Sequence, residues 1–364
     1  MVDHSTPRSR RATASHPLAA VLAGAAAVVA ALTGPAAWAA AQPTPPDPVD
    51  ECVVEDDRLA ELSGLAADAE FRYAVGDGGS RLQVLVLRQD CTVQRVITAA
   101  VDPFDVEDMT LGLDGRLWLA DTGDNSGQRE TVALHVLSPN GPPELYRLTY
   151  PDGPHDAEAL LLDRDGQPYI VTKEALGSAG VYRPSGELTT SGPTPLELVT
   201  SVRFARTDTP GGPIGSLGSS VVTGGAVSSD GEVVALRTYT DAYLFTVPDG
   251  DVVAALGGTP VRVPLPDEPQ GEAIAFTPDG DLLSASEQAE AGPQPIRVIS
   301  GAVELAAAAD PTPDTTEPPA ATESTDSATS EQERSGLADW QAVLIAVVGA
   351  AGVIIVISRI AARR

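Results

Sequence analysis

The amino-acid sequence predicts an all-β fold, a β-propeller of five blades, from three observations. A unit of two short apolar strands joined by a turn with aspartate occurs five times between residues 51 and 303. Successive turn aspartates are 46, 51, 65 and 49 residues apart, and a repeat of about 45 to 50 residues is typical of a propeller blade. No long helical apolar pattern competes with this interpretation. The turn aspartates are Asp68, Asp114, Asp165, Asp230 and Asp279.

Each unit supplies the first two strands of a blade. In four of the five units the turn is Asp-Gly, the strongest short-range signal for a β-hairpin. The units span residues 62–77, 106–121, 157–174, 223–238 and 272–287. Further β-rich stretches follow and are expected to form outer strands, at 82–87, 131–137, 242–247 and 295–300.

The number of blades and the closure of the ring depend on two further segments. The long interval before Asp230 leaves room for a sixth, degenerate unit around 196–205, so six blades remain an alternative. The last unit has one clear strand after its pair, and CVVEDD (52–57) is expected to supply the missing outer strand. Such closure removes open sheet edges. The main alternative fold is a two-sheet sandwich, which does not require the same unit five times.

The N-terminal segment has the pattern of a secretory signal peptide. Three arginines in residues 1–17 precede an apolar run at 18–33, and small-residue tripeptides follow up to Ala41. We therefore expect residues 1–41 to be removed on export; the alternative is a retained anchor, although 16 apolar residues are few for a membrane span. A Pro-rich leader at 42–50 comes next.

The C-terminal segment predicts a membrane anchor. Residues 304–336 are rich in Ala, Pro, Thr, Ser and Glu, which predicts a disordered stalk. A charge-free run of 18 residues (341–358) follows Trp340 and precedes a basic tail at 359–364. This pattern predicts one transmembrane helix over 337–358, with the tail in the cytoplasm and the ectodomain (51–303) outside the cell. The alternative is a buried core helix.

The two cysteines, Cys52 and Cys91, are expected to form a disulfide. Both lie in the exported part of the chain, and an even pair in an oxidising compartment usually bonds. Closure of the ring would bring Cys52, in the expected closing strand, close to Cys91 in the first unit. The alternative is two free thiols. Two cysteines are too few for a zinc cluster or a disulfide-dense scaffold.

The charge balance limits the partners of the protein. The sequence has 51 acidic residues against 23 basic ones, a net charge of −28. This balance argues against nucleic acid, because binding phosphates needs a basic face. The bias towards Arg, Ala, Gly and Pro is typical of a GC-rich bacterial genome.

Several segments resemble known propeller families. DGRLWLADTGDN (114–125) is similar to the blade motif of the NHL-repeat propellers, from which the inserted Asp124 departs. The segments at 156–166 and 272–287 resemble strands of the phytase-like and SMP-30-like calcium propellers. The resemblance covers the repeats, not the termini, and implies the propeller fold; the termini and the composition separately indicate a secreted, membrane-anchored protein of actinobacterial type. The resemblance does not imply one activity, since these folds include lactonases, phosphatases, lyases and binding modules.

Carboxylates are expected to gather at one rim of the propeller. In an antiparallel blade, the start of the first strand and the end of the second lie at the same rim, opposite the Asp-Gly turns. Clustered carboxylates favour a cation, and Ca²⁺ takes about 6 to 8 oxygen ligands. The alternative is a solvated acidic rim without metal. The candidate ligands are Asp105, Glu107, Asp108, Asp121, Asp124, Asn125, Asp156, Glu158 and Glu272.

Other polar residues are weaker candidates. Four residues at the ends of second strands are candidate ligand-binding residues, or they only offset neighbouring charges: Lys173, Glu174, Arg237 and Glu287. His155 is the candidate catalytic base, although a hydrogen-bonding loop residue is the simpler interpretation, and His135 is expected to pack within a strand. The exported part contains no Gly-x-Ser-x-Gly elbow.

Three classes of function remain open. The first is a surface-anchored module that binds an extracellular protein, glycan or small molecule, with Ca²⁺ on the acidic rim. The second is a calcium-dependent hydrolase, a phytase-like phosphoesterase or a lactonase, which needs no protein nucleophile. The third is a structural partner of other membrane proteins.

Overall fold

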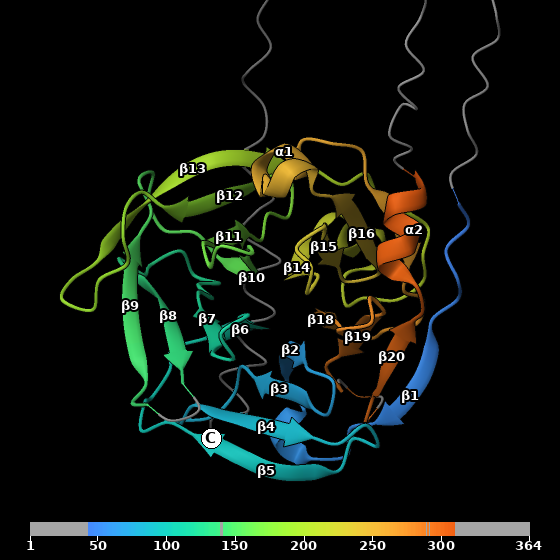
Figure 1. Ribbon diagram of the computed structural model, residues 1–364, viewed down its shortest axis with the longest axis horizontal. Helices are drawn as coiled ribbons and strands as arrows, with labels where there is room; N and C mark the ends of the chain where they lie inside the picture. The colour runs from blue at the N-terminus through green and yellow to red at the C-terminus, as the bar shows by residue number, and fades with distance from the viewer. Residues whose placement is uncertain (1–42, 139–140, 289, 291, 310–364) are drawn as a thin grey trace, which may run out of the picture. The chain divides into compact units, whose positions relative to one another are not determined.

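The computed structural model describes residues 43–138, 141–288, 290 and 292–309. In this part of the chain, twenty strands form five blades of four strands each, arranged in a ring (Figure 1). Within each blade neighbouring strands are antiparallel. The expected propeller with five blades is therefore the observed fold of the described residues.

Three blades follow the chain without interruption, from the innermost strand outwards. Blade 1 consists of β2 (Leu62–Ala67), β3 (Arg72–Gly76), β4 (Gln83–Leu87) and β5 (Val93–Thr98). Blade 2 consists of β6 (Val106–Leu111), β7 (Leu117–Asp121), β8 (Val132–Leu137) and β9 (Glu144–Thr149). Blade 3 consists of β10 (Ala157–Leu162), β11 (Pro168–Thr172), β12 (Ala179–Pro184) and β13 (Thr194–Val202).

The last two blades contain the additional helices and the closure of the ring. Blade 4 consists of β14 (Val222–Val227), β15 (Val233–Thr238), β16 (Asp241–Thr246) and β17 (Val261–Pro264). Blade 5 consists of β18 (Gly271–Phe276), β19 (Leu282–Ser286), β20 (Pro295–Ile299) and the N-terminal β1 (Val49–Val53). The helical segments are η1 (Asp57–Leu59), η2 (Gly215–Ser220), η3 (Pro248–Gly250), α1 (Val252–Leu256) and α2 (Ala302–Ala309).

The hydrophobic core is divided among the gaps between blades. Five buried apolar clusters are found in the described residues, and each contains side chains from two adjacent blades. The cluster between blades 1 and 2, for example, joins Val84 and Val86 to Met109 and Leu119. Each blade is thus apolar on both faces, which explains why the second strands read as nearly continuous apolar runs.

The predicted two-strand units are confirmed. Each unit coincides with the first two strands of one blade, and the four Asp-Gly turns have their glycine at positive φ, between 73° and 87°. A glycine adopts this conformation without steric cost, which is why the pair marks the turn so reliably.

The expected ring closure and disulfide are also confirmed. β1 pairs with β20 in the last blade, and Cys52 in β1 is bonded to Cys91 in the turn between β4 and β5. The bond therefore joins the closing strand to blade 1. The closing strand begins at Val49, three residues before the expected start and inside the segment assigned to a Pro-rich leader.

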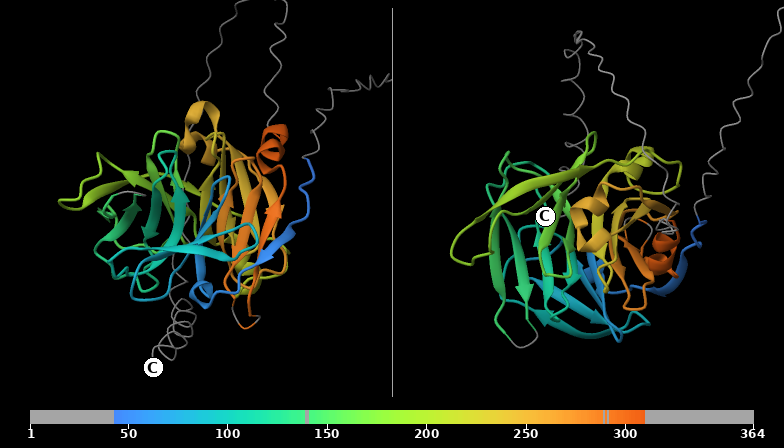
Figure 2. Two further views of the ribbon diagram at one scale, coloured as in Figure 1. Left: turned by 60° about the horizontal axis from the view of Figure 1, so that its bottom comes forward. Right: turned by 45° about the horizontal axis from the view of Figure 1, so that its top comes forward.

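The alternative of a sixth blade is wrong for the described residues. Residues 196–202 belong to β13, the long outer strand of blade 3, which also makes two parallel pairs with β9 of blade 2. This strand runs along the outside of the ring in both views of Figure 2. The long interval between turns is accounted for by β13 and by the loop that follows it, with η2.

The expected boundary between propeller and stalk at residue 304 is wrong. α2 continues to Ala309, and its Leu305 and Ala306 are buried in the cluster between blades 4 and 5. The expected signal peptide, the rest of the stalk and the transmembrane segment lie outside the described residues. Among the helices that are described, none has the length and apolar character needed to cross a membrane.

Candidate functional site

The five innermost strands share one irregularity of strand pairing, and the candidate site is built on it. In each of them the pairing register shifts at the second residue, which forms a β-bulge. A bulge leaves one residue unpaired and redirects its side chain, and bulges often lie next to functional sites. All five side chains are buried. We call these residues the bulge ring: Ser63, Glu107, Glu158, Thr223 and Glu272.

A second set of residues lies at the same rim. Each of these residues directly follows the second strand of its blade, as the antiparallel pairing with the innermost strand requires. Thr122 shows the proximity, because its hydroxyl donates to the carbonyl of Ala157, one residue before Glu158. The set comprises Asp77, Thr122, Lys173, Tyr239 and Glu287.

Three carboxylates converge between blades 2 and 3. Glu107, Asp156 and Glu158 each place one carboxylate oxygen so that the three atoms lie within 4.8 Å of one another. We call this group the carboxylate cluster. Within the described residues, Glu107 Oε1 and Glu158 Oε2 are buried and have no hydrogen-bond partner. Gly123 leaves space for two carboxylates at this place, since a Cβ there would collide with Glu107 and Asp105.

One cation of the protein lies against this cluster. Lys173, the only lysine in the sequence, forms an ion pair with Glu158 through Nζ. Its Nζ also lies 5.4 Å from the ring centroid of Tyr239. A single ammonium group cannot balance Glu107, Asp156 and Glu158 together.

The electrostatics reflect this imbalance. Burial, and then the charge of Glu158, raises the pKa of Glu107 well above its usual value. Burial also raises the pKa of Glu158, with Lys173 acting in the opposite direction. Burial disfavours the ammonium form of Lys173, but the surrounding carboxylates and Tyr239 raise its pKa well above the usual value.

Asp108 was expected at the metal site but has a different role. Its carboxylate accepts three backbone hydrogen bonds: from Met109 on its own strand (2.8 Å), from Leu160 of blade 3 (2.7 Å) and from Gly225 of blade 4 (3.1 Å). These N–H groups belong to innermost strands, which have no further strand to pair with. Asp108 therefore joins three blades at the axis.

Asp121 and Asp124 organise a loop instead of converging with the carboxylate cluster. Asp121 accepts hydrogen bonds from the N–H groups of Phe104 and Asp105, from Arg129 and from His135. Burial alone would raise the pKa of Asp121, but these donors and the charge of Arg129 lower it to about 2.

Asp124 accepts bonds from the N–H groups of Gln128 and Arg129, and its own N–H donates to Asp156 at 2.7 Å. The loop after β7 thus positions one member of the carboxylate cluster. Asn125 is exposed and lies outside the cluster.

His155 belongs to a separate polar group. Its Nε2 lies 3.1 Å from Asp152 Oδ1 and 3.2 Å from the Tyr182 hydroxyl, and its Nδ1 lies 3.7 Å from Glu174. The ring also packs against Tyr150. Neither nitrogen contacts the carboxylate cluster, so the geometry favours a hydrogen-bonding role, the simpler of the two interpretations.

Arg237 and Glu287 differ in what surrounds them. Arg237 is fully buried and donates to Glu268 (2.6 Å) and to backbone carbonyls of blade 5, so it joins blades 4 and 5 and does not face a ligand. Glu287 lies beside Glu272. Burial and that neighbouring carboxylate raise the pKa of Glu287 to about 11.

Sequence analysis missed Ser63, Thr223 and Tyr239. Their positions equal those of Glu107, Glu158 and Lys173 in other units, so an alignment of the five units by position would have found them. Only carboxylates were expected at this rim, so the hydroxyl groups at the same positions were not predicted.

Comparisons with known proteins give no family for this chain. No protein-family model matches the sequence, and no curated protein sequence matches it. An aldose sugar dehydrogenase from Streptomyces coelicolor with bound PQQ is 10% identical with a TM-score of 0.39, over 70% of this chain and 99% of that one. A gluconolactonase from Xanthomonas campestris is 18% identical with a TM-score of 0.36, over 67% and 82%.

A streptogramin B lyase structure is 13% identical with a TM-score of 0.31, over 65% of this chain. The chain spans only 64% of the length of that lyase.

Proposed function

We propose that this protein is a ligand-binding propeller whose carboxylate cluster holds a divalent cation, Ca²⁺ by preference. The cation would offer open coordination positions to an extracellular ligand at the acidic rim. Lys173 lies next to these positions, so an anionic or polar group on the ligand would contact both the cation and the ammonium group.

The observation that supports this proposal most strongly is the convergence of Glu107, Asp156 and Glu158. Buried carboxylate oxygens without partners are unfavourable, because they lose hydration and gain nothing in return. Glu107 Oε1 and Glu158 Oε2 are two such atoms in the described part of the chain. A cation among the three carboxylates would remove this cost.

The donor set determines the class of metal. All three candidate ligands are carboxylates. Hard cations such as Ca²⁺ prefer oxygen ligands, and Ca²⁺ tolerates irregular geometry with water completing its shell. His155, the ligand type that zinc would favour, lies in the separate group with Asp152 and Tyr182.

Thermal unfolding of the purified full-length protein tests the cation. Because Ca²⁺ would bind only the folded state, millimolar Ca²⁺ should raise Tm by about 5 °C or more relative to excess chelator. Glu107→Gln combined with Glu158→Gln should abolish the response.

The matched control is Glu232→Gln, an exposed carboxylate beside an Asp-Gly turn at the opposite rim. This variant should keep the full calcium response. If the wild-type Tm were the same in Ca²⁺ and in chelator, the acidic rim would be a surface without a bound cation. This result would contradict the proposal.

We also propose that the propeller is displayed outside the cell on a single membrane anchor. The support is the sequence pattern of the two ends, above all the arginines after the apolar run at 341–358. Protease added to intact cells should release a soluble propeller cut within residues 310–336. A protected propeller together with a digested C-terminal tag would reverse the proposed orientation.

A calcium-dependent hydrolase is the second candidate. Lys173 and Tyr239 lie together beside the carboxylate cluster, which would place two proton donors next to a cation-bound substrate. Bound Ca²⁺ would supply the polarisation of a lactone carbonyl or a phosphoester. Turnover of such substrates that is lost in both Lys173→Met and Tyr239→Phe, but kept in Glu232→Gln, would favour the enzyme over the binding module.

A further inference from the structure

Blade 1 carries a cavity that is separate from the carboxylate cluster. Its volume is about 490 Å³, which lies in the range of small-molecule sites. The walls come from the residues around η1, from the loop between β3 and β4 and from Pro103. Glu61 directly precedes β2, the innermost strand of blade 1, and none of the residues of the carboxylate cluster lines the cavity.

The loop between β3 and β4 lines this cavity, and its glycines leave space for a neighbouring side chain. Its residues 76–81 read Gly-Asp-Gly-Gly-Ser-Arg, and Gly79 has a φ of 102°, which only glycine adopts readily. A Cβ at Gly78 would collide with the Glu61 carboxylate. The glycines therefore leave room for the Glu61 side chain along the cavity wall.

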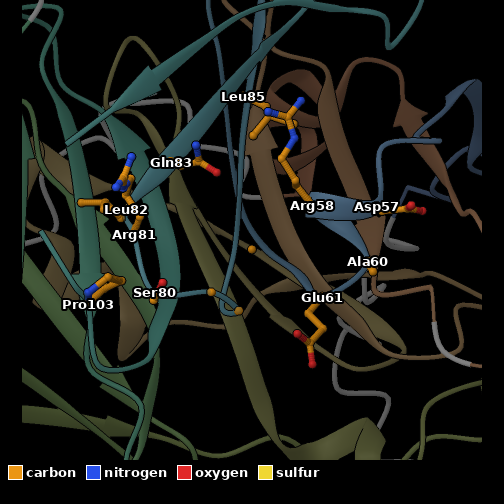
Figure 3. Close-up of a pocket in the computed structure, with 13 residues that line it drawn as sticks. Asp57, Arg58, Ala60, Glu61, Ser80, Arg81, Leu82, Gln83, Leu85 and Pro103 are labelled. Carbon is orange, nitrogen blue, oxygen red and sulfur yellow. The ribbon is translucent and has the colours of Figure 1, made fainter. Parts of the chain in front are cut away.

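Two guanidinium groups lie towards one end of the cavity. Figure 3 shows Arg58 and Arg81 on either side of Gln83, with their guanidinium groups at the same end. Asp56 fixes Arg58 through bonds of 2.8 and 2.7 Å to Nε and Nη2. Arg81 is exposed and forms no hydrogen bond or ion pair with the described residues.

The opposite end of the cavity carries a negative group. In Figure 3 the carboxylate of Glu61 points away from the two arginines, at the other end of the lining. Glu61 is exposed. A ligand that carried only negative charge would be attracted at one end and repelled at the other. A ligand with both charges would match Arg81 at one end and Glu61 at the other.

We propose that this cavity binds a zwitterion, a free amino acid or a short peptide. The ligand carboxylate would contact the fork of Arg81 and the Gln83 amide, with Arg58, whose Nε and Nη2 are bonded to Asp56, contributing only through Nη1, and the ligand ammonium group would contact Glu61. Arginine suits carboxylate recognition because its planar fork donates two parallel hydrogen bonds. This binding goes beyond the proposed function and needs no cation.

Calorimetric titration of the full-length protein with glycylglycine, in the presence of chelator, tests the proposal. Removal of either charge of the ligand should weaken binding at least 10-fold, as measured with N-acetylglycylglycine and glycylglycinamide. Arg81→Gln and Glu61→Gln should each weaken glycylglycine binding to a similar extent. Arg88→Gln, an exposed arginine in the turn between β4 and β5, is the control and should leave the affinity unchanged.

Four results would overturn the proposal. They are no binding at millimolar glycylglycine, equal binding of the capped peptides, no effect of Arg81→Gln, and displacement of glycylglycine by an equal concentration of inorganic phosphate. The last result would indicate a general anion site. Because chelator is present throughout, failure here is independent of whether the carboxylate cluster binds Ca²⁺.

Discussion

The two ends of the propeller axis are built from the same five strands but have opposite chemistry. At the end of the Asp-Gly turns, a cavity of about 350 Å³ is lined mainly by small and apolar residues, among them Leu65, Met109 and Phe276. At the other end the same strands carry the bulge ring, with three glutamates and two hydroxyl residues. The fold of these strands therefore does not by itself require carboxylates at an end of the axis.

The difference shows where the sequence departs from what the fold needs. Apolar side chains at the turn end satisfy the ordinary demand of a buried axis. Buried carboxylates at the other end are unfavourable without partners, and such departures are expected at functional sites. The contrast between the two ends therefore supports the assignment of function to the bulge ring more strongly than the number of acidic residues does.

Asp108 lies at the axis and joins three blades there, and its removal should cause the largest loss of unfolding free energy. Asp108→Ala leaves the N–H groups of Met109, Leu160 and Gly225 without their acceptor, which should cost about 4 kcal/mol of unfolding free energy. Asp108→Asn keeps one acceptor oxygen and should lose less. Denaturant unfolding measures both, and a loss below about 1 kcal/mol in Asp108→Ala would show that the axis does not depend on this residue.

Substitution of Asp121 tests how much this buried carboxylate stabilises the loop at the acidic end. Its folded pKa of about 2 lies below the unfolded value, so its stabilisation is present above about pH 4 and is lost as the pH falls towards 2. Asp121→Asn should therefore cost about 2 kcal/mol at pH 7 and much less near pH 2.

The control for Asp121 is Asp114→Asn, in an exposed Asp-Gly turn, which should change stability by about 0.5 kcal/mol or less. Equal losses for Asp121→Asn at pH 7 and near pH 2 would count against the ionic role of Asp121. Unfolding monitored across this pH range gives the comparison.

Glu287 should show an effect of the opposite sign. Its folded pKa is raised, so its contribution is unfavourable above the unfolded value near pH 4 and vanishes below that value. Glu287→Gln should therefore raise stability by about 1 kcal/mol or more at pH 7 and leave it unchanged below pH 4. A variant that is less stable than the wild type at pH 7 would contradict the repulsion from Glu272.

Much of the fold could be predicted from local sequence. Asp-Gly pairs specify turns through backbone conformation alone, and apolar runs between turns mark buried strands, so all five strand pairs were found. The alternative of a sixth unit around 196–205 remained open because a long outer strand such as β13 has the same β-rich composition as an inner one. Helix α2 was assigned to the stalk because alanine-rich composition does not reveal burial against blades 4 and 5.

The rim on which the candidate site lies could be predicted from the sequence, but the contacts of its side chains could not. Antiparallel geometry placed Glu107, Asp156 and Glu158 at one end of the ring, and the structure brings them together. Antiparallel geometry alone could not show that Asp108 accepts backbone hydrogen bonds across three blades or that Asp121 is held by Arg129. These roles depend on side-chain directions at bulges and in loops, which spacing does not determine.

The central claim is that the bulged end of the axis binds a cation and the turn end does not. The most direct measurement is calorimetric titration of Ca²⁺ into the chelator-treated, full-length protein. We predict one ion bound per chain in the wild type and in Glu232→Gln, and none when Glu107→Gln and Glu158→Gln are combined. The absence of binding heat at millimolar Ca²⁺, or an unchanged titration in the double variant, would contradict this account.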